Sequence, residues 1–74
     1  MQLTFTTFER SDVSERWHET GSCVQTGEHA KAGWERVLEA RPLFKGLGCW
    51  QRLSGNVFTC IRGDKLYKSV YVYA

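Results

Sequence analysis

Two tight-turn signals in succession constrain the fold of this chain more than any other feature of its sequence. Gly63-Asp64 separates two runs rich in apolar and β-branched residues, and Ser54-Gly55-Asn56 separates the first of these runs from an earlier one. Short segments of Gly, Asn and Asp between such runs are typical of β-hairpins. We therefore expect an antiparallel three-strand meander formed by Gly46–Leu53, Val57–Arg62 and Lys65–Tyr73.

The first half of the chain is expected to add one strand and one helix. Gln2–Phe8 alternates apolar and polar residues and is rich in Thr and Phe, which predicts a strand. Thr26–Arg41 has apolar residues at helical spacing, which predicts a helix. We expect the Thr26 hydroxyl to cap its start and Pro42 to end it, because proline disfavours the helical conformation in the residue before it.

Glu9–Gly21 is open to two interpretations. Val13 and Trp17 are four residues apart and can share one face of a helix, or they can share one face of a strand with Glu15. We favour a loose hairpin arm that continues into a short strand at Ser22–Gln25.

The whole chain, residues 1–74, is short enough to be one domain. The predicted class is α+β, with one helix on an antiparallel sheet of four to five strands in the order β(β)αβββ. Its aromatic content of 14% is high enough to build a small core.

The two faces of the meander are predicted to differ. Because Gly63-Asp64 forms a two-residue turn, Arg62 opposes Lys65, and directly opposed residues share a face. One face is aliphatic and is expected to carry the helix; its members are Val57, Thr59, Ile61, Leu66, Val70 and Val72, and Lys68 shares this face. The other residues expected in that core are Leu3, Phe5, Trp34, Val37 and Leu38.

The opposite face of the meander is expected to stay open, because one helix covers only one side of a sheet. Exposed aromatic and Arg residues are common in protein interfaces. Open sheets also stack single-stranded bases on such rings, and the third interpretation is that the tyrosines are purely structural. The predicted partner-binding residues are Arg52, Phe58, Arg62, Lys65, Tyr67, Lys68 and Tyr71.

The side taken by Trp50 and Arg52 depends on the register of the first hairpin. A three-residue loop places both residues with Phe58 and Arg62, whereas a two-residue loop places them on the aliphatic face. The sequence leaves both registers open.

Charge is unevenly distributed along the chain. Residues 41–74 hold six Lys and Arg against Asp64 alone, whereas residues 1–40 hold four against seven carboxylates. The net charge of +2 is too small to indicate nucleic-acid binding by itself. It also argues against an acidic mimic of DNA.

The sequence predicts neither a cofactor nor an enzyme. His and Cys residues lack the close paired spacing of zinc sites, and no nucleophile, base and orienting acid can be grouped. Three cysteines and no leader sequence favour a reduced, cytoplasmic protein with free thiols at Cys23, Cys49 and Cys60. No apolar run approaches the roughly 20 residues of a membrane span.

The order of elements resembles small phage-encoded anti-CRISPR proteins, in particular inhibitors of type I Cascade surveillance complexes. The residues that carry the resemblance are the Glu19-Thr20-Gly21 turn, the helix opening Thr26-Gly27-Glu28-His29-Ala30, and Leu43-Phe44-Lys45-Gly46 leading into hairpins. The resemblance implies a non-enzymatic inhibitor in the bacterial host cytoplasm, acting as a monomer or weak homodimer. Its implied partner is a Cas subunit or a ribonucleoprotein complex, and its implied action is to block recognition of target DNA. A small nucleic-acid-binding module is the alternative.

Overall fold

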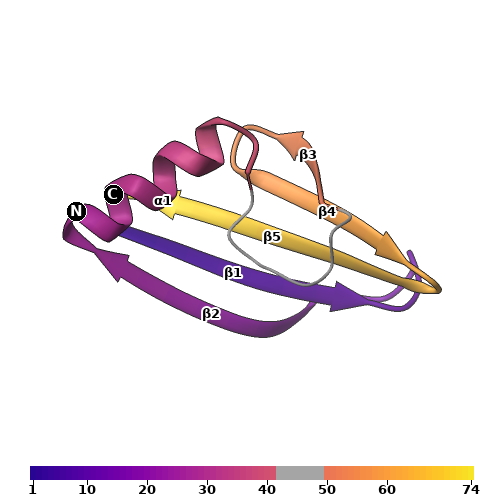
Figure 1. Ribbon diagram of the computed structural model, residues 1–74. Helices are drawn as coiled ribbons and strands as arrows, with labels where there is room; N and C mark the ends of the chain where they lie inside the picture. Colours follow the sequence, from indigo (N-terminus) through magenta and orange to yellow (C-terminus); the bar gives the residue numbers. More distant parts are fainter. Residues whose placement is uncertain (42–49) are drawn as a thin grey trace.

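A five-stranded antiparallel sheet and one helix make up residues 1–41 and 50–74, the part of the chain that this computed structural model describes (Figure 1). The elements are β1 (Gln2–Arg10), β2 (His18–Thr26), α1 (Gly27–Leu38), β3 (Gln51–Ser54), β4 (Val57–Arg62) and β5 (Lys65–Tyr73). The sheet order is β2-β1-β5-β4-β3. The predicted α+β class and the order β(β)αβββ are thereby confirmed.

The two ends of the chain meet in the middle of the sheet. β1 and β5 are nine residues each and pair along their length. Gln2 and Ala74 exchange two backbone hydrogen bonds of 2.7 and 2.9 Å, so the termini lie side by side (Figure 1). This pairing joins the N-terminal hairpin to the C-terminal meander in one sheet.

The hairpin interpretation of the N-terminal half is confirmed. β2 begins at His18 and pairs with β1, with a register shift between Thr7 and Phe8. The segment from Ser11 to Trp17 is an irregular turn, so the helical alternative for this segment is wrong. β2 is longer than the predicted strand because its pairing with β1 extends beyond the apolar pattern on which the prediction rested.

Both turns of the meander follow the predicted chemistry. Arg62 opposes Lys65 across Gly63-Asp64. In the first hairpin Arg52 opposes Phe58 and Ser54 opposes Val57, with a register shift between Arg52 and Ser54. With this shift Arg52 lies on the same face as Phe58, as predicted for a three-residue loop. Trp50 packs against the hydrophobic core.

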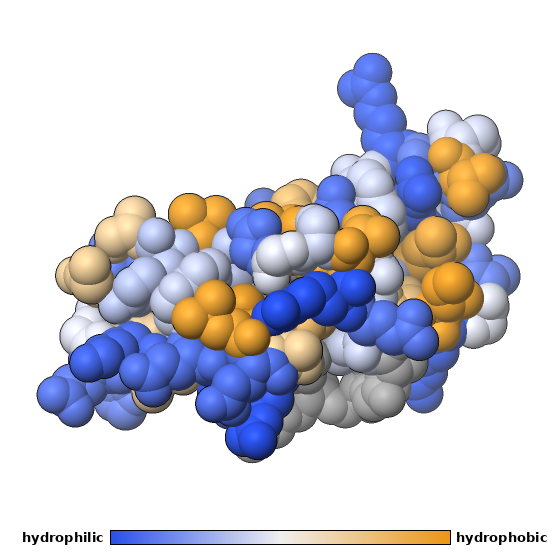
Figure 2. Space-filling view, turned by 90° about the horizontal axis from the view of Figure 1, so that it is seen from above, coloured by the Kyte–Doolittle hydropathy of each residue, from blue (hydrophilic) through white to orange (hydrophobic). Residues whose placement is uncertain are grey.

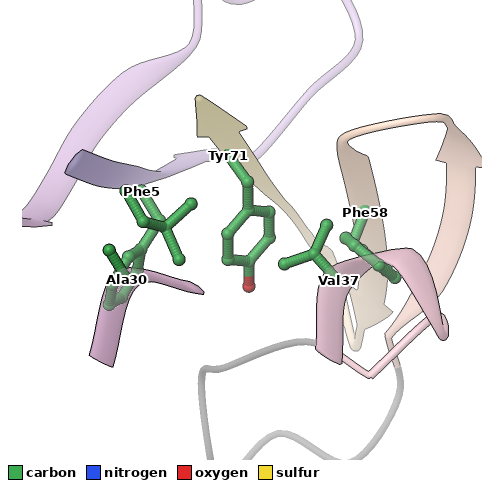
Figure 3. Close-up of a cluster of buried hydrophobic side chains, with 6 residues drawn as sticks. Phe5, Ala30, Val37, Phe58 and Tyr71 are labelled. Carbon is green, nitrogen blue, oxygen red and sulfur yellow. The ribbon is translucent and has the colours of Figure 1, made fainter. Parts of the chain in front are cut away.

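The core lies between α1 and the aromatic face of the sheet. Tyr71 is at its centre, with its ring 5.7 Å from that of Phe5 and 5.6 Å from that of Phe58. Figure 3 shows the Tyr71 ring between Phe5 on one side and Val37 and Phe58 on the other. The core cluster consists of Leu3, Phe5, Ala30, Val37, Phe58 and Tyr71.

The prediction that the helix covers the aliphatic face of the meander is therefore wrong. In the sheet, Leu3 opposes Tyr73 and Phe5 opposes Tyr71. The apolar face of β1 is thus continuous with the tyrosine face of β5, and the helix must bury that face. The residues Val57, Ile61, Leu66 and Val70 lie on the other side of the sheet.

The helix residues predicted for the core have three different environments. Val37 is fully buried. Trp34 is half-buried and stacks on Tyr73, with ring centroids 5.5 Å apart and planes within 8°. Leu38 is 58% exposed, so its assignment to the core is wrong.

Both ends of α1 differ from the prediction. Thr26 is at the N-cap, but its side chain makes no capping hydrogen bond within the described residues. The helix ends at Leu38 rather than Arg41, since Ala40 takes a left-handed φ of 62°. The Ala40 amide donates to the Val37 carbonyl at 3.0 Å, and the Arg41 amide donates to that of Arg36 at 2.8 Å. This Schellman arrangement ends the helix before Pro42.

The cysteines also depart from the prediction. Cys23 is free and exposed. Cys60 is disulfide-bonded, so the prediction of a free thiol there is wrong. The spacing of cysteines along the chain does not show which sulfur atoms lie close enough to form a disulfide. The prediction for Cys49 lies outside the described residues.

Replacing Ala40 with Gly should stabilise the protein by about 0.5–1 kcal/mol, because a left-handed residue without a Cβ avoids the steric cost that Ala carries. The same change at the exposed helix residue Ala32 should destabilise by about 1 kcal/mol. Urea unfolding followed by circular dichroism measures both. Destabilisation by Ala40→Gly would contradict the Schellman ending.

Phe58→Ala should cost about 3–5 kcal/mol by loss of buried apolar area and creation of a cavity. Ile61→Ala, on the same strand but 72% exposed, should cost less than about 1 kcal/mol. Thermal unfolding of the two variants compares the faces directly. A larger loss for Ile61→Ala would mean that the helix covers the other face.

Candidate binding surface

The predicted partner-binding residues are divided among four places. Phe58 and Tyr71 are buried in the core, so their prediction as partner-contacting residues is wrong. The Arg52 guanidinium donates a hydrogen bond to the Val37 carbonyl and lies over the Phe58 ring. Arg52 thus ties β3 to the C-terminal end of α1, where a cation complements the helix dipole.

Three further predicted residues lie on the helix side of the sheet, at the β4–β5 turn. Arg62 and Lys65 oppose each other and are exposed, and Tyr67 is half-buried opposite Cys60. Figure 2, seen from the side of α1 and β3, shows hydrophobic residues intermixed with hydrophilic ones. These three residues remain accessible, although the platform of rings predicted around them is covered.

Lys68 lies on the opposite face of the sheet, which the helix does not cover. We call this the open face, and its strand residues follow from the register of the ladders. Val24, Ile61 and Val72 are more than half exposed there. The large aliphatic residues of the open face are Val24, Val57, Ile61, Leu66, Val70 and Val72. They alternate with Thr4, Thr6 and Thr59.

One end of the open face holds two cations over aromatic rings. The Lys68 Nζ lies 4.9 Å from the ring centroid of Phe8 and 4.5 Å from that of Trp17. The Arg10 guanidinium carbon lies 4.4 Å from the Trp17 centroid. We call Phe8, Arg10, Trp17 and Lys68 the cation–ring cluster. Such contacts are electrostatic attractions between a positive charge and the ring faces.

The β1–β2 loop positions Trp17 in this cluster. The Asp12 carboxylate accepts hydrogen bonds from the Ser14 amide at 2.8 Å and from the Ser14 hydroxyl at 2.9 Å. These bonds favour the ionised form and lower the pKa of Asp12, with a smaller contribution from Arg10. The Arg10 guanidinium also donates to the Val13 carbonyl at 3.4 Å. The loop therefore folds back towards the strand that carries Arg10.

Sequence reasoning missed Phe8, Arg10 and Trp17 as surface residues. The contact between Phe8 and Lys68 depends on the pairing of β1 with β5, which are nearly the whole chain apart. The alternation of Gln2–Phe8 places Phe8 on the face opposite to Phe5, but it does not name the neighbouring strand. Trp17 follows from no local pattern, because an irregular loop carries it.

Nothing in the described ranges points to bound metal or to a membrane span. No group of three His, Cys, Asp or Glu residues gathers within residues 1–41 and 50–74. No helix in the same ranges is long and apolar enough to cross a bilayer. Comparisons with protein-family models, with curated proteins and with solved structures gave no match.

A double-mutant cycle between Lys68→Met and Trp17→Leu should give a coupling energy of about 0.5–1 kcal/mol, the range for partly exposed cation–ring contacts. Lys65→Met is the matched control, because Lys65 lies three residues away on the other face. Its coupling to Trp17→Leu should be within about 0.3 kcal/mol of zero. Denaturant unfolding measures all of these variants, and equal coupling at both lysines would contradict the cluster.

Proposed function

We propose that this chain is a small non-enzymatic protein that binds a protein partner through the open face of its sheet. The observation that carries the proposal is the set of six large aliphatic residues on the side of the sheet opposite the helix. Monomeric soluble proteins rarely leave extended apolar areas uncovered, and such areas commonly mark interaction sites. The open face provides a large contact area with few groups that must lose water on binding.

The cation–ring cluster gives this surface a charged margin. Arg10 and Lys68 place two positive charges at one end of the aliphatic area, where Glu19, opposite Phe8, adds one carboxylate. A partner that fits would place apolar side chains against the valines and carboxylates against this end. Charges at the margin of an interface mainly raise the association rate and fix orientation.

The arrangement favours a protein over a nucleic acid as partner. The rings predicted to stack bases, Phe58 and Tyr71, are inside the core. The Trp17 ring already has two cations against it, and they would compete with a stacking base. Binding of single strands depends on ring faces that are free to stack. Of the predicted binding residues on the helix side, Arg62, Lys65 and Tyr67 remain accessible for a nucleic-acid role.

The resemblance to inhibitors of type I Cascade makes a Cas subunit the partner to test first. In this proposal the protein acts in the cytoplasm of a bacterial host and blocks target-DNA recognition. The disulfide at Cys60 weighs against that compartment, because cytosolic thiols are usually kept reduced. The inhibition assay should therefore be run with and without reductant.

The test adds the protein to a purified type I surveillance complex and measures binding of target DNA. Ile61→Ser and Val72→Ser should each weaken inhibition by about 1–3 kcal/mol, the range for central interface contacts. Leu38→Ser is the matched control, because Leu38 is a similarly exposed aliphatic residue on the helix, at 58% against 53% for Val72. It should leave inhibition unchanged.

Two outcomes would count against the proposal. If the wild-type protein leaves DNA recognition intact in several type I complexes, the Cascade assignment is wrong. If it binds nucleic acid directly, with affinity that falls steeply with salt and depends on Arg62 and Lys65, the nucleic-acid alternative replaces the protein partner.

A further inference from the structure

The sheet has two edges, and they are protected to different degrees. β3 is four residues long, has a register shift and carries Arg52. β2 is nine residues long, with one register shift between Gly21 and Glu19, and it is the outermost strand of the sheet, with no other described element beyond it (Figure 1). Its segment from Thr20 to Thr26 contains no charged residue and no proline. Charges, prolines and short length are the usual protection of edge strands against pairing with other strands.

The alternating direction of backbone hydrogen bonds along the strands shows which N–H and C=O groups of β2 point outward. Gln2 exchanges two backbone hydrogen bonds with Ala74, so the backbone N–H and C=O groups of the even-numbered residues of β1 point towards β5. By alternation, the backbone N–H and C=O groups of Phe5 point towards β2, where Phe5 pairs with Cys23. The N–H and C=O groups of Ser22 and Val24, on either side of Cys23, therefore point away from the sheet.

We propose that β2 pairs antiparallel with β2 of a second copy of this chain, about a two-fold axis at Cys23. In this register Ser22 of one copy opposes Val24 of the other, and both of these pairs use the outward-pointing groups. The backbone groups left open at the edge are thereby satisfied. The result is one continuous sheet across two copies.

A second copy fits this edge because the strand is complementary to itself. A symmetric pair brings like residues close together, and like charges directly opposed would destabilise it. The seven-residue segment from Thr20 to Thr26 has none. Thr20 of one copy opposes Thr26 of the other, and Gly21 opposes Gln25. The side chains of Ser22 and Val24 lie on the open face, so pairing would join the two open faces.

The register makes Cys23 a reporter of the interface. Cys23 opposes its own copy in a non-hydrogen-bonded pair, where Cα atoms are about 4.5 Å apart. That separation lies within the roughly 4.4–6.8 Å that a disulfide spans. Cys23 is free and exposed in the single chain, so mild oxidation can capture the pair.

The first experiment measures self-association by sedimentation velocity over a range of concentrations. The wild-type chain should dimerise. Val24→Pro should raise the dimer dissociation constant at least tenfold, because proline removes an outward-pointing N–H while the β1–β2 hydrogen bonds remain. Val24→Ala keeps the N–H and should change the constant less than threefold. Circular dichroism checks that both variants are folded.

The second experiment fixes the register without relying on proline. Copper-catalysed oxidation of the wild-type chain should give a covalent dimer that Cys23→Ser abolishes. In the Cys23→Ser background, Ser22→Cys and Val24→Cys should cross-link with each other when mixed and at least tenfold less when each is alone. A wild-type chain that stays monomeric, a folded Val24→Pro variant that dimerises normally, or equal cross-linking of either variant alone would overturn the proposal.

Discussion

The pairing of β1 with β5 is the contact on which the rest of the structure depends. It places Leu3 and Phe5 beside Tyr73 and Tyr71, and so makes one apolar face out of strands from the two ends of the chain. The helix buries that face because Ala30 and Gly33 let it approach closely and Val37 fills the space between the rings. The face that the helix buries determines which residues are exposed on the other surfaces of the sheet.

One helix on one sheet leaves a particular set of surfaces. The covered side contains the aromatic core, and Arg52 joins the end of the helix to β3. The opposite side exposes aliphatic residues and the cation–ring cluster. β2 is the longer of the two edge strands, and its outer edge is unprotected. The proposed function follows from the open face and the proposed dimer from the edge of β2, and the two features meet at Val24.

The candidate site was predicted less well than the fold. Alternation correctly grouped Phe58 with Tyr67 and Tyr71, since opposed residues across a two-residue turn must share a face. It did not determine which face the helix would cover, because each face of the meander carries enough apolar area to attract a helix. Since the helix buried the aromatic face, Lys68 was left on the opposite surface, beside a tryptophan from a distant loop.

The sequence by itself determined the elements that depend on neighbouring residues. Gly63-Asp64 set the register of the last hairpin, and the alternation of Gln2–Phe8 and the helical spacing before Pro42 gave the strand and the helix. Only the tertiary structure decided which face is buried, where the helix ends, and that Phe8, Arg10, Trp17 and Lys68 gather. Those features depend on strand pairing between the ends of the chain and on a left-handed Ala40. Local periodicity carries no information about which distant strand becomes a neighbour.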